Sequence, residues 1–432
     1  MAETGTYLHM HGTNHYYPGL DHQSAAVPLP PLAEVAAALR EITEILACEL
    51  AVPTVEPPHW SEFEWCIARA VAAMQGVASL LRSGSRWTGP AGWRRFLDEQ
   101  HDHVAGRHKH IVQLLDRIDA QARRDEIAVV ALKGTALHSI GIYEAGERPM
   151  ADVDLLVHNV DVNATARLLE DCGFELTGTN SRHRLFESRL RRDSNVVNLG
   201  EHAENPLKIE LHTSIRECLP IRETDITRFL LPHPANAGLN PYPSIAGLMM
   251  HLLLHAAGNM RTHALRLIQL HDVARLAARF GPCDWEELLT ARPNDRGLWW
   301  ALAPLTLTAR YHPGAIPPLV IARLNAECPW LLGKLSRHRR LADVSWSDIR
   351  VHAFPGIEWS RTPQEAISFM FSRIWPSREA RSELVHFAAH QPGACDVPWY
   401  GISQGARILR WVFSKPPRVQ TLLTVRAALT KR

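Results

Sequence analysis

The segment from residue 127 to residue 157 constrains the fold most, because strand-like and helix-like patterns alternate within it. Residues 127–132 form a short apolar run of strand length that stops at Lys133-Gly134-Thr135. A helix is expected from Ala136 to about Tyr143. Residues 151–157 begin with alternating polar and apolar side chains, as a strand with one wet face would. This order predicts a small sheet with helices between its strands.

Two carboxylates stand out in the second of these strands. Asp152 and Asp154 lie at positions i and i+2, so we expect both side chains on one face, within reach of a common cation. Magnesium prefers such hard oxygen ligands and is commonly shared between one or two protein carboxylates and substrate phosphates. An Asp-x-Asp pair alone is weak evidence, because most such pairs are solvated strand edges or turns. Evidence for a metal site therefore depends on the order of the motifs that surround this pair.

That order places a glycine turn before the carboxylates. Lys133-Gly134-Thr135 opens the expected helix, and a turn of this kind brings backbone amides to a phosphate while nearby carboxylates hold its cation. With Leu132-Lys133-Gly134 followed by Arg148-Pro149-Met150-Ala151-Asp152-Val153-Asp154-Leu155-Leu156-Val157, the chain resembles the DNA polymerase β superfamily. The resemblance is closest to the superfamily's bacterial branch of uncharacterised nucleotidyltransferases, and it covers about residues 127 to 280.

The resemblance implies a role for each of these residues. Asp152, Asp154 and a third carboxylate, Glu210, would be catalytic and would hold Mg²⁺, or Mn²⁺ in its place. The triphosphate would be bound by Lys133, Gly134, Thr135 and Arg148. Independently of the resemblance, His212 lies two residues after Glu210 and is expected on the same strand face, where it could contact substrate. Asp161 and Glu175 are poorer third carboxylates, because they fall in a turn and near a strand start. The wider superfamily has Gly-Ser at the first turn, which leaves the phosphate contacts of Lys133-Gly134-Thr135 open.

Each of these side chains also has a purely structural interpretation. Lys133 can be a solvated residue at a helix start, Arg148 can pair with Glu147 or Asp152 to order a turn, and Glu210 can face solvent on an edge strand. His212 can equally be a structural histidine.

The expected reaction is Mg²⁺-dependent transfer of a nucleoside monophosphate from a nucleoside triphosphate to a hydroxyl, with release of pyrophosphate. The acceptor stays open between a small molecule, a protein and an RNA. Two alternatives are a catalytically inactive protein that binds a nucleotide or a partner, and a toxin-type enzyme that modifies tRNA or protein. The inactive alternative is disfavoured because clustered carboxylates repel one another without a cation.

The rest of the chain predicts an α+β protein with a polymerase β-like nucleotidyltransferase core and a small mixed sheet, flanked by a helical leader and a helical C-terminal domain. Apolar residues recur at helical spacing before residue 125 and again from Ser244 onward. Further sheet segments are expected at 174–176, 182–188, 195–199 and 207–212, with a helix at 160–172. The expected divisions are a flexible arm (1–30), the leader (31–125), the core (126–240), the helical domain (241–400) and a basic tail (401–432).

Charge and composition restrict the partners. The 47 basic and 45 acidic residues nearly cancel, so no global field exists to hold a long nucleic acid. The seven cysteines never form Cys-x-x-Cys, and no window approaches the roughly 20 apolar residues of a spanning helix, so we expect a cytoplasmic protein without integral membrane association. The tail lacks acids after Asp396 and is either a solvated helix face or a segment that binds an anionic surface.

Overall fold

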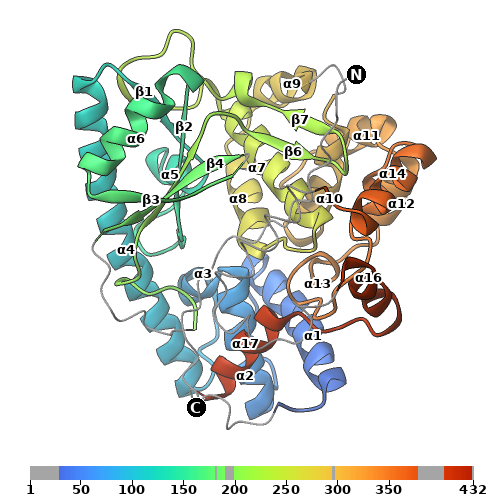
Figure 1. The fold of residues 1–432 in the computed structure, drawn as a ribbon. Helices are drawn as coiled ribbons and strands as arrows, with labels where there is room; N and C mark the ends of the chain where they lie inside the picture. The colour runs from blue at the N-terminus through green and yellow to red at the C-terminus, as the bar shows by residue number, and fades with distance from the viewer. Residues whose placement is uncertain (1–28, 181, 190–198, 294–296, 378–402, 431–432) are drawn as a thin grey trace.

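The computed structural model describes residues 29–180, 182–189, 199–293, 297–377 and 403–430 (Figure 1). The expected arm falls almost entirely outside these residues, as do residues 195–198 of one expected sheet segment. Within the described part of the chain, no helix is both long and apolar enough to cross a membrane.

Four helices precede the sheet. They are α1 (Leu32–Ala51), α2 (Glu62–Gln75), α3 (Ala78–Gly84) and α4 (Ala91–Arg124). Helix α2 begins at a capping box in which the Ser61 hydroxyl accepts from the Glu64 amide and the Glu64 carboxylate accepts from the Ser61 amide. It ends at Gly76, whose φ of 69° is the left-handed conformation that favours glycine at a helix end. Prolines 53, 57, 58 and 90 lie between these helices, where they interrupt no helical hydrogen bonds.

A mixed six-stranded sheet forms the centre of the α+β fold. Its spatial order is β3 (Phe174–Thr179), β4 (His183–Ser188), β5 (Lys208–His212), β2 (Val153–Val157), β1 (Ala128–Ala131) and β8 (Gly238–Asn240). Strands β2 and β5 are parallel, as are β1 and β8, whereas β1–β2, β3–β4 and β4–β5 are antiparallel. A separate hairpin joins β6 (Arg216–Cys218) to β7 (Glu223–Asp225).

Strand β2 corrects two expectations. It begins at Val153, so Asp152 precedes the strand, and all five of its residues are buried, so it has no wet face. The reason is that the sheet is covered on both faces. Val153, Leu155 and Val157 pack with residues of α4 and of α6 (Val162–Asp171), while Leu156 packs into the core of the helical region. Figure 1 shows α4 and α6 on one side of the sheet.

The helix after the glycine turn is shorter than expected. Helix α5 (Gly134–Ser139) begins two residues before Ala136 and ends well before Tyr143. Gly141, with a φ of 67°, lies just after its end and turns the chain away. Tyr143 consequently lies in the following loop, from which its hydroxyl reaches the buried carboxylate of Asp272.

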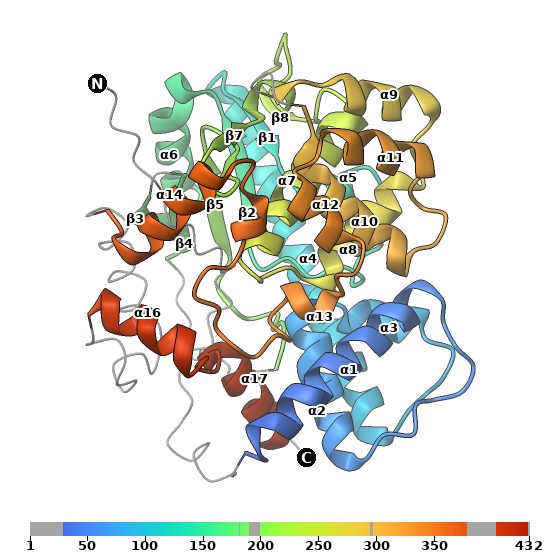
Figure 2. The same cartoon turned by 90° about the vertical axis from the view of Figure 1, so that its right-hand side faces the viewer.

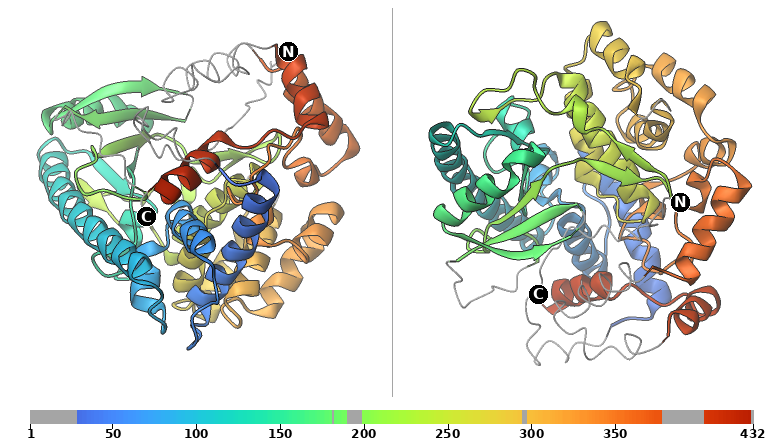
Figure 3. Two further views of the ribbon diagram at one scale, coloured as in Figure 1. Left: turned by 90° about the horizontal axis from the view of Figure 1, so that it is seen from below. Right: turned by 45° about the horizontal axis from the view of Figure 1, so that its top comes forward.

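The region after the sheet is helical, as its spacing predicts. It contains α7 (Ile245–Arg261), α8 (Leu267–Ala277), α9 (Pro282–Thr290), α10 (Leu302–Tyr311), α11 (Pro318–Glu327), α12 (Trp330–Ser336), α13 (Leu341–Val344), α14 (Pro363–Ile374), α16 (Gln404–Phe413) and α17 (Val419–Thr430). Figure 3 shows α7 and α8, in yellow, between the green strands and the orange helices.

The two ends of the described chain pack together. Helix α17 lies against α2 and α1 contacts α13, and one apolar core runs through the leader, α7, α8 and α10 (Figure 2). Val425, Ala428 and Leu429 of the basic tail are buried in this core, so α17 is not a solvated arm. Helix α16 keeps Arg410 exposed, and binding of the tail to an anionic surface stays a prediction, as do the domain boundaries.

Candidate active site

Neighbouring strands bring the expected carboxylates together. Asp154 of β2 and Glu210 of β5 are register partners in a parallel pair, so both side chains leave the sheet on the same face. Lys133 follows β1 on the other side of β2 and reaches Asp154 with its ammonium group, 2.9 Å from Oδ1. Asp152 lies two residues before Asp154, immediately ahead of the strand.

Asp154 is the most deeply held of these acids. Its Oδ1 atom accepts from Lys133 Nζ and lies 3.1 Å from His212 Nε2, and the residue is 5% exposed. Burial would raise the pKa of Asp154, but Lys133 and His212 hold it well below its usual value. Asp154 is therefore ionised at neutral pH.

Asp152 has the opposite electrostatic environment. Burial, together with repulsion from Asp154 and Glu210, raises the pKa of Asp152 to about 7, against the opposing influence of Lys133 and Arg107. The two aspartates and Glu210 titrate as an interacting group, because each carboxylate feels the charge of the others. A cation placed among them would relieve this repulsion, which is the chemical fit expected of a divalent-metal site.

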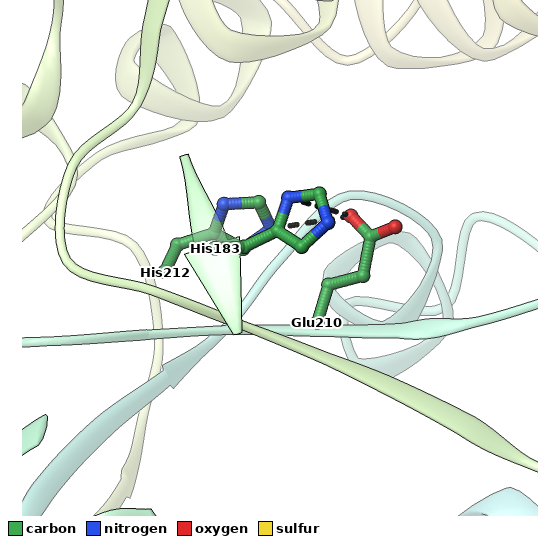
Figure 4. A group of neighbouring side chains, drawn as sticks. All are labelled: His183, Glu210 and His212. Atoms are coloured by element: carbon green, nitrogen blue, oxygen red, sulfur yellow. Dashed lines mark ion pairs between the residues drawn. The ribbon is translucent and has the colours of Figure 1, made fainter. Parts of the chain in front are cut away.

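Glu210 lies within a group of histidines (Figure 4). Its Oε2 atom is 3.6 Å from His183 Nδ1 and 3.5 Å from His212 Nε2, and one ligand atom from each residue lies within 4.8 Å of the other two. Burial lowers the pKa of His183 to about 4. Burial opposes protonation of His212 as well, but its hydrogen bonds to Asp154 and Glu210 raise its pKa. His212 thus bridges two of the expected carboxylates.

Arg107 of α4 fixes the backbone on both sides of this group. Its guanidinium donates to the carbonyl oxygens of Met150 (2.6 Å) and Ala151 (2.6 Å), just ahead of Asp152. It also donates to the carbonyl oxygen of Asn205 (2.8 Å), shortly before β5. The side chain is 3% exposed. One buried arginine therefore positions both of the segments that lead into the carboxylates.

A pocket opens between the sheet and the helices beside Asp154. Its sheet wall is formed by residues 132–135, 148–152 and Asp154, and its helical wall by Leu252 and His255 of α7, Arg266, and Ile268, Gln269 and Asp272 of α8. The pocket lining includes six of the expected site residues, namely Lys133, Gly134, Thr135, Arg148, Asp152 and Asp154. Glu210 and His212 are not part of this lining and lie on the far side of Asp154.

Arg148 crosses from one wall of the pocket to the other. Its Nε and Nη2 atoms donate to Oδ1 (2.9 Å) and Oδ2 (2.7 Å) of Asp272, and the Tyr143 hydroxyl also donates to Oδ1 (2.8 Å). Asp272 is 1% exposed. The hydrogen-bond partner of Arg148 is thus neither Glu147 nor Asp152 but the buried carboxylate of Asp272.

The glycine turn is tightly constrained. Lys133 has a φ of 50°, a conformation that strains a residue with a side chain, and its amide donates to the Tyr242 hydroxyl. A Cβ atom on Gly134 would collide with the Arg148 guanidinium. The Thr135 amide donates to the Leu132 carbonyl, which leaves its hydroxyl as the group expected to contact a ligand.

Comparison with known protein families identifies the family of the chain. A family described as an uncharacterised nucleotidyltransferase matches residues 61–312, which is more than half of the chain. The chain belongs to this nucleotidyltransferase family. No curated protein matches the sequence. Membership of the polymerase β superfamily stays a prediction.

In this nucleotidyltransferase the match extends beyond the residues that carry the sequence resemblance. It begins at Ser61, the cap of α2, and continues through the sheet to the end of α10, so it includes Arg107 and Asp272. Sequence reasoning missed two residues of the site, His183 and Arg107. His183 lies in the expected sheet segment 182–188, but nothing in that segment marks it as a site residue. Arg107 acts across a long sequence separation that no local pattern reveals, and so does the contact between Arg148 and Asp272.

Proposed function

We propose that this nucleotidyltransferase moves a nucleoside monophosphate from a nucleoside triphosphate to a hydroxyl acceptor at the pocket beside Asp154, in a magnesium-dependent reaction. The observation that carries the proposal is the convergence of Asp152, Asp154 and Glu210, where burial together with repulsion from the other two carboxylates raises the pKa of Asp152 to about 7. Carboxylates that repel one another in a buried cluster cost stability unless a cation joins them.

Asp152, Asp154 and Glu210 would hold the cation. A magnesium ion held there would supply positive charge that offsets the negative charge of the triphosphate. Asp154 meets the requirement for an ionised ligand, because Lys133 and His212 keep its pKa low. Asp152, whose pKa is raised to about 7 by burial and by its neighbouring carboxylates, would have to give up its proton to hold the cation.

The remaining residues would position the substrates. Lys133 supplies a positive charge at the pocket, and the Thr135 hydroxyl a hydrogen-bond donor, to the triphosphate. Arg148 lines the same pocket, but its Nε and Nη2 atoms both donate to Asp272. We therefore assign Arg148 mainly to holding the two walls of the pocket together. Any phosphate contact would fall to its Nη1 atom, which contacts only a backbone carbonyl at 3.3 Å in the described hydrogen bonds.

The transfer step forms a bond between the acceptor oxygen and the α-phosphorus and breaks the bond to pyrophosphate. The acceptor proton would pass to Glu210. Burial would raise the pKa of Glu210, but His183 and His212 lower it, so the carboxylate is ionised and can accept a proton at neutral pH.

Calorimetric titration with ATP, GTP, CTP and UTP, each with and without magnesium, tests the proposal. We expect at least one nucleotide to bind the wild-type protein only when magnesium is present, and Asp154→Asn to abolish this binding. Glu175→Gln removes an exposed carboxylate on β3 and serves as the matched control, which should bind like wild type. Absence of binding by any of the four nucleotides to folded wild-type protein would refute the proposal.

A further inference from the structure

A second group of ligating side chains lies in the helical region, away from the pocket. His263 follows the C-terminal end of α7, and Asp348 and His352 lie in the segment after α13. One atom from each lies within 4.8 Å of the other two. His352 Nε2 is 2.6 Å, and His263 Nδ1 is 3.5 Å, from the same oxygen, Asp348 Oδ2.

His263 is the residue that an ordinary hydrogen-bond network does not explain. The residue is only 9% exposed, and among the described residues its Nδ1 atom has no hydrogen-bond partner. Its backbone also has a φ of 57°, a strained conformation for a residue with a side chain. Buried polar atoms normally have a hydrogen-bond partner, so this ring nitrogen beside a carboxylate is available as a ligand for a bound ion.

The surrounding backbone holds the three ligands in place. The Leu265 amide donates to the Val344 carbonyl (3.0 Å), which fixes the chain after His263 to the start of the second segment. The Val351 amide donates to the Pro416 carbonyl (2.8 Å), which fixes the segment beside His352. The Arg350 amide donates to Asp348 Oδ1 at 3.4 Å, so Oδ2 is the oxygen that faces the two imidazoles.

We propose that His263, Asp348 and His352 bind a divalent transition-metal ion of the zinc type, which ties the end of α7 to the segment after α13. Two imidazole nitrogens and one carboxylate oxygen form a ligand set that zinc uses, with water in a fourth position. Ligand atoms around tetrahedral zinc are about 3.3 Å apart, given zinc–nitrogen distances of about 2.0–2.1 Å. The His263–Asp348 distance already fits. His352 has to move outward by less than 1 Å, and it can do so because its side chain is 41% exposed.

The charge balance limits the affinity. Neutral imidazoles and one carboxylate leave a net positive charge with a divalent ion, and the buried guanidinium of Arg418 also interacts with Asp348. We therefore expect affinity on the order of micromolar, below that of structural zinc sites built from thiolates.

Zinc titration of the full chain after removal of metals with a chelator tests the proposal. Asp348→Asn should remove one equivalent of bound zinc, and His352→Ala should weaken that equivalent at least about tenfold. His338→Ala, which removes an exposed histidine on a nearby segment, is the matched control and should leave binding unchanged. His183→Ala identifies any zinc that binds to the group of His183, Glu210 and His212, so that the two sites are counted separately.

Thermal unfolding gives a second measurement that does not depend on counting equivalents. Zinc should raise the Tm of the wild type and of His183→Ala, because an ion that binds only the folded state stabilises the folded state. The rise attributable to this site should be absent in Asp348→Asn. His352→Ala keeps the test valid if Asp348→Asn fails to fold. Unchanged zinc affinity and an unchanged thermal shift in His352→Ala would overturn the proposal.

Discussion

The two walls of the pocket treat their acids in opposite ways. On the helical wall, Asp272 is 1% exposed and accepts from both arms of Arg148 and from the Tyr143 hydroxyl, so its charge is compensated. On the sheet wall, burial and repulsion from Asp154 and Glu210 together raise the pKa of Asp152 to about 7. An acid paired with a cationic side chain stabilises the fold. An acid that neighbouring carboxylates repel lowers the stability of the fold, and such acids are typical of functional sites.

Removal of the paired acid on the helical wall should have the largest effect. Asp272→Ala leaves the buried Arg148 guanidinium without its partner, and we expect the free energy of unfolding to fall by about 3–5 kcal/mol. Urea unfolding followed by circular dichroism measures this. Asp102→Ala, whose side chain is 82% exposed, is the control and should change stability by less than about 0.5 kcal/mol. A loss below about 1 kcal/mol for Asp272→Ala would mean that the pair does not hold the walls together.

Arg107 offers a way to disturb the sheet wall without touching its acids. Lysine keeps the charge but cannot donate to three carbonyl oxygens at once, so Arg107→Lys should cost about 2 kcal/mol of stability. It should also weaken divalent-metal binding about tenfold, because the segments before Asp152 and β5 lose their common support. Isothermal titration with Mn²⁺ checks this against Arg117→Lys, an exposed substitution on the same helix. Unchanged metal affinity in a destabilised Arg107→Lys protein would make Arg107 purely structural.

Gly134→Ala tests whether the two walls are coupled through Arg148. The added methyl group would collide with the guanidinium, and overpacking of this kind costs about 1–3 kcal/mol. Combined with Asp272→Asn, the effects should be less than additive, since both changes break the same ion pair. A double-mutant cycle on unfolding free energies measures the coupling, and strict additivity would contradict it.

The smallest expected effect is a gain in stability instead of a loss. Asp152→Asn should stabilise the metal-free protein by about 1–2 kcal/mol at pH 8, because it removes a charge that the folded state disfavours. The folded pKa of Asp152 is about 7, above its ordinary value, so its ionisation lowers stability as pH rises towards 7. The extra stability of Asp152→Asn over the wild type should therefore decrease as the pH is lowered from 7 to 5. Thermal unfolding at pH 8 and pH 5 checks this, and a destabilised variant at pH 8 would refute it.

The sequence predicted the parts of the molecule that depend on local patterns. The strands around residues 128–131, 153–157 and 208–212 followed from short apolar or alternating runs, and the Asp-x-Asp spacing singled out both acids of the sheet wall of the pocket. The limits of α5 were wrong, because the turn at Gly141 ends the helix early. The wet face expected for β2 was wrong because α4 and the helical region cover both sides of the sheet, which only tertiary packing decides.

The contacts that organise the site could not be predicted in the same way. Arg107 lies far along the chain from the carbonyl oxygens that it binds, and Arg148 finds Asp272 across 124 positions. Nothing in the residues around either arginine specifies such a partner. Charged residues of this kind have several plausible neighbours in sequence, and the fold decides which of them they meet.

The most direct test of the central claim is to count divalent ions at the sheet wall. Mn²⁺ binding, followed by electron paramagnetic resonance in an Asp348→Asn background, excludes the second cluster from the count. We predict that Asp154→Asn and Glu210→Gln each weaken this binding at least about 100-fold, while Glu175→Gln binds like the parent. Equal Mn²⁺ affinity in the parent and in folded Asp154→Asn would contradict the assignment of these carboxylates as a metal site.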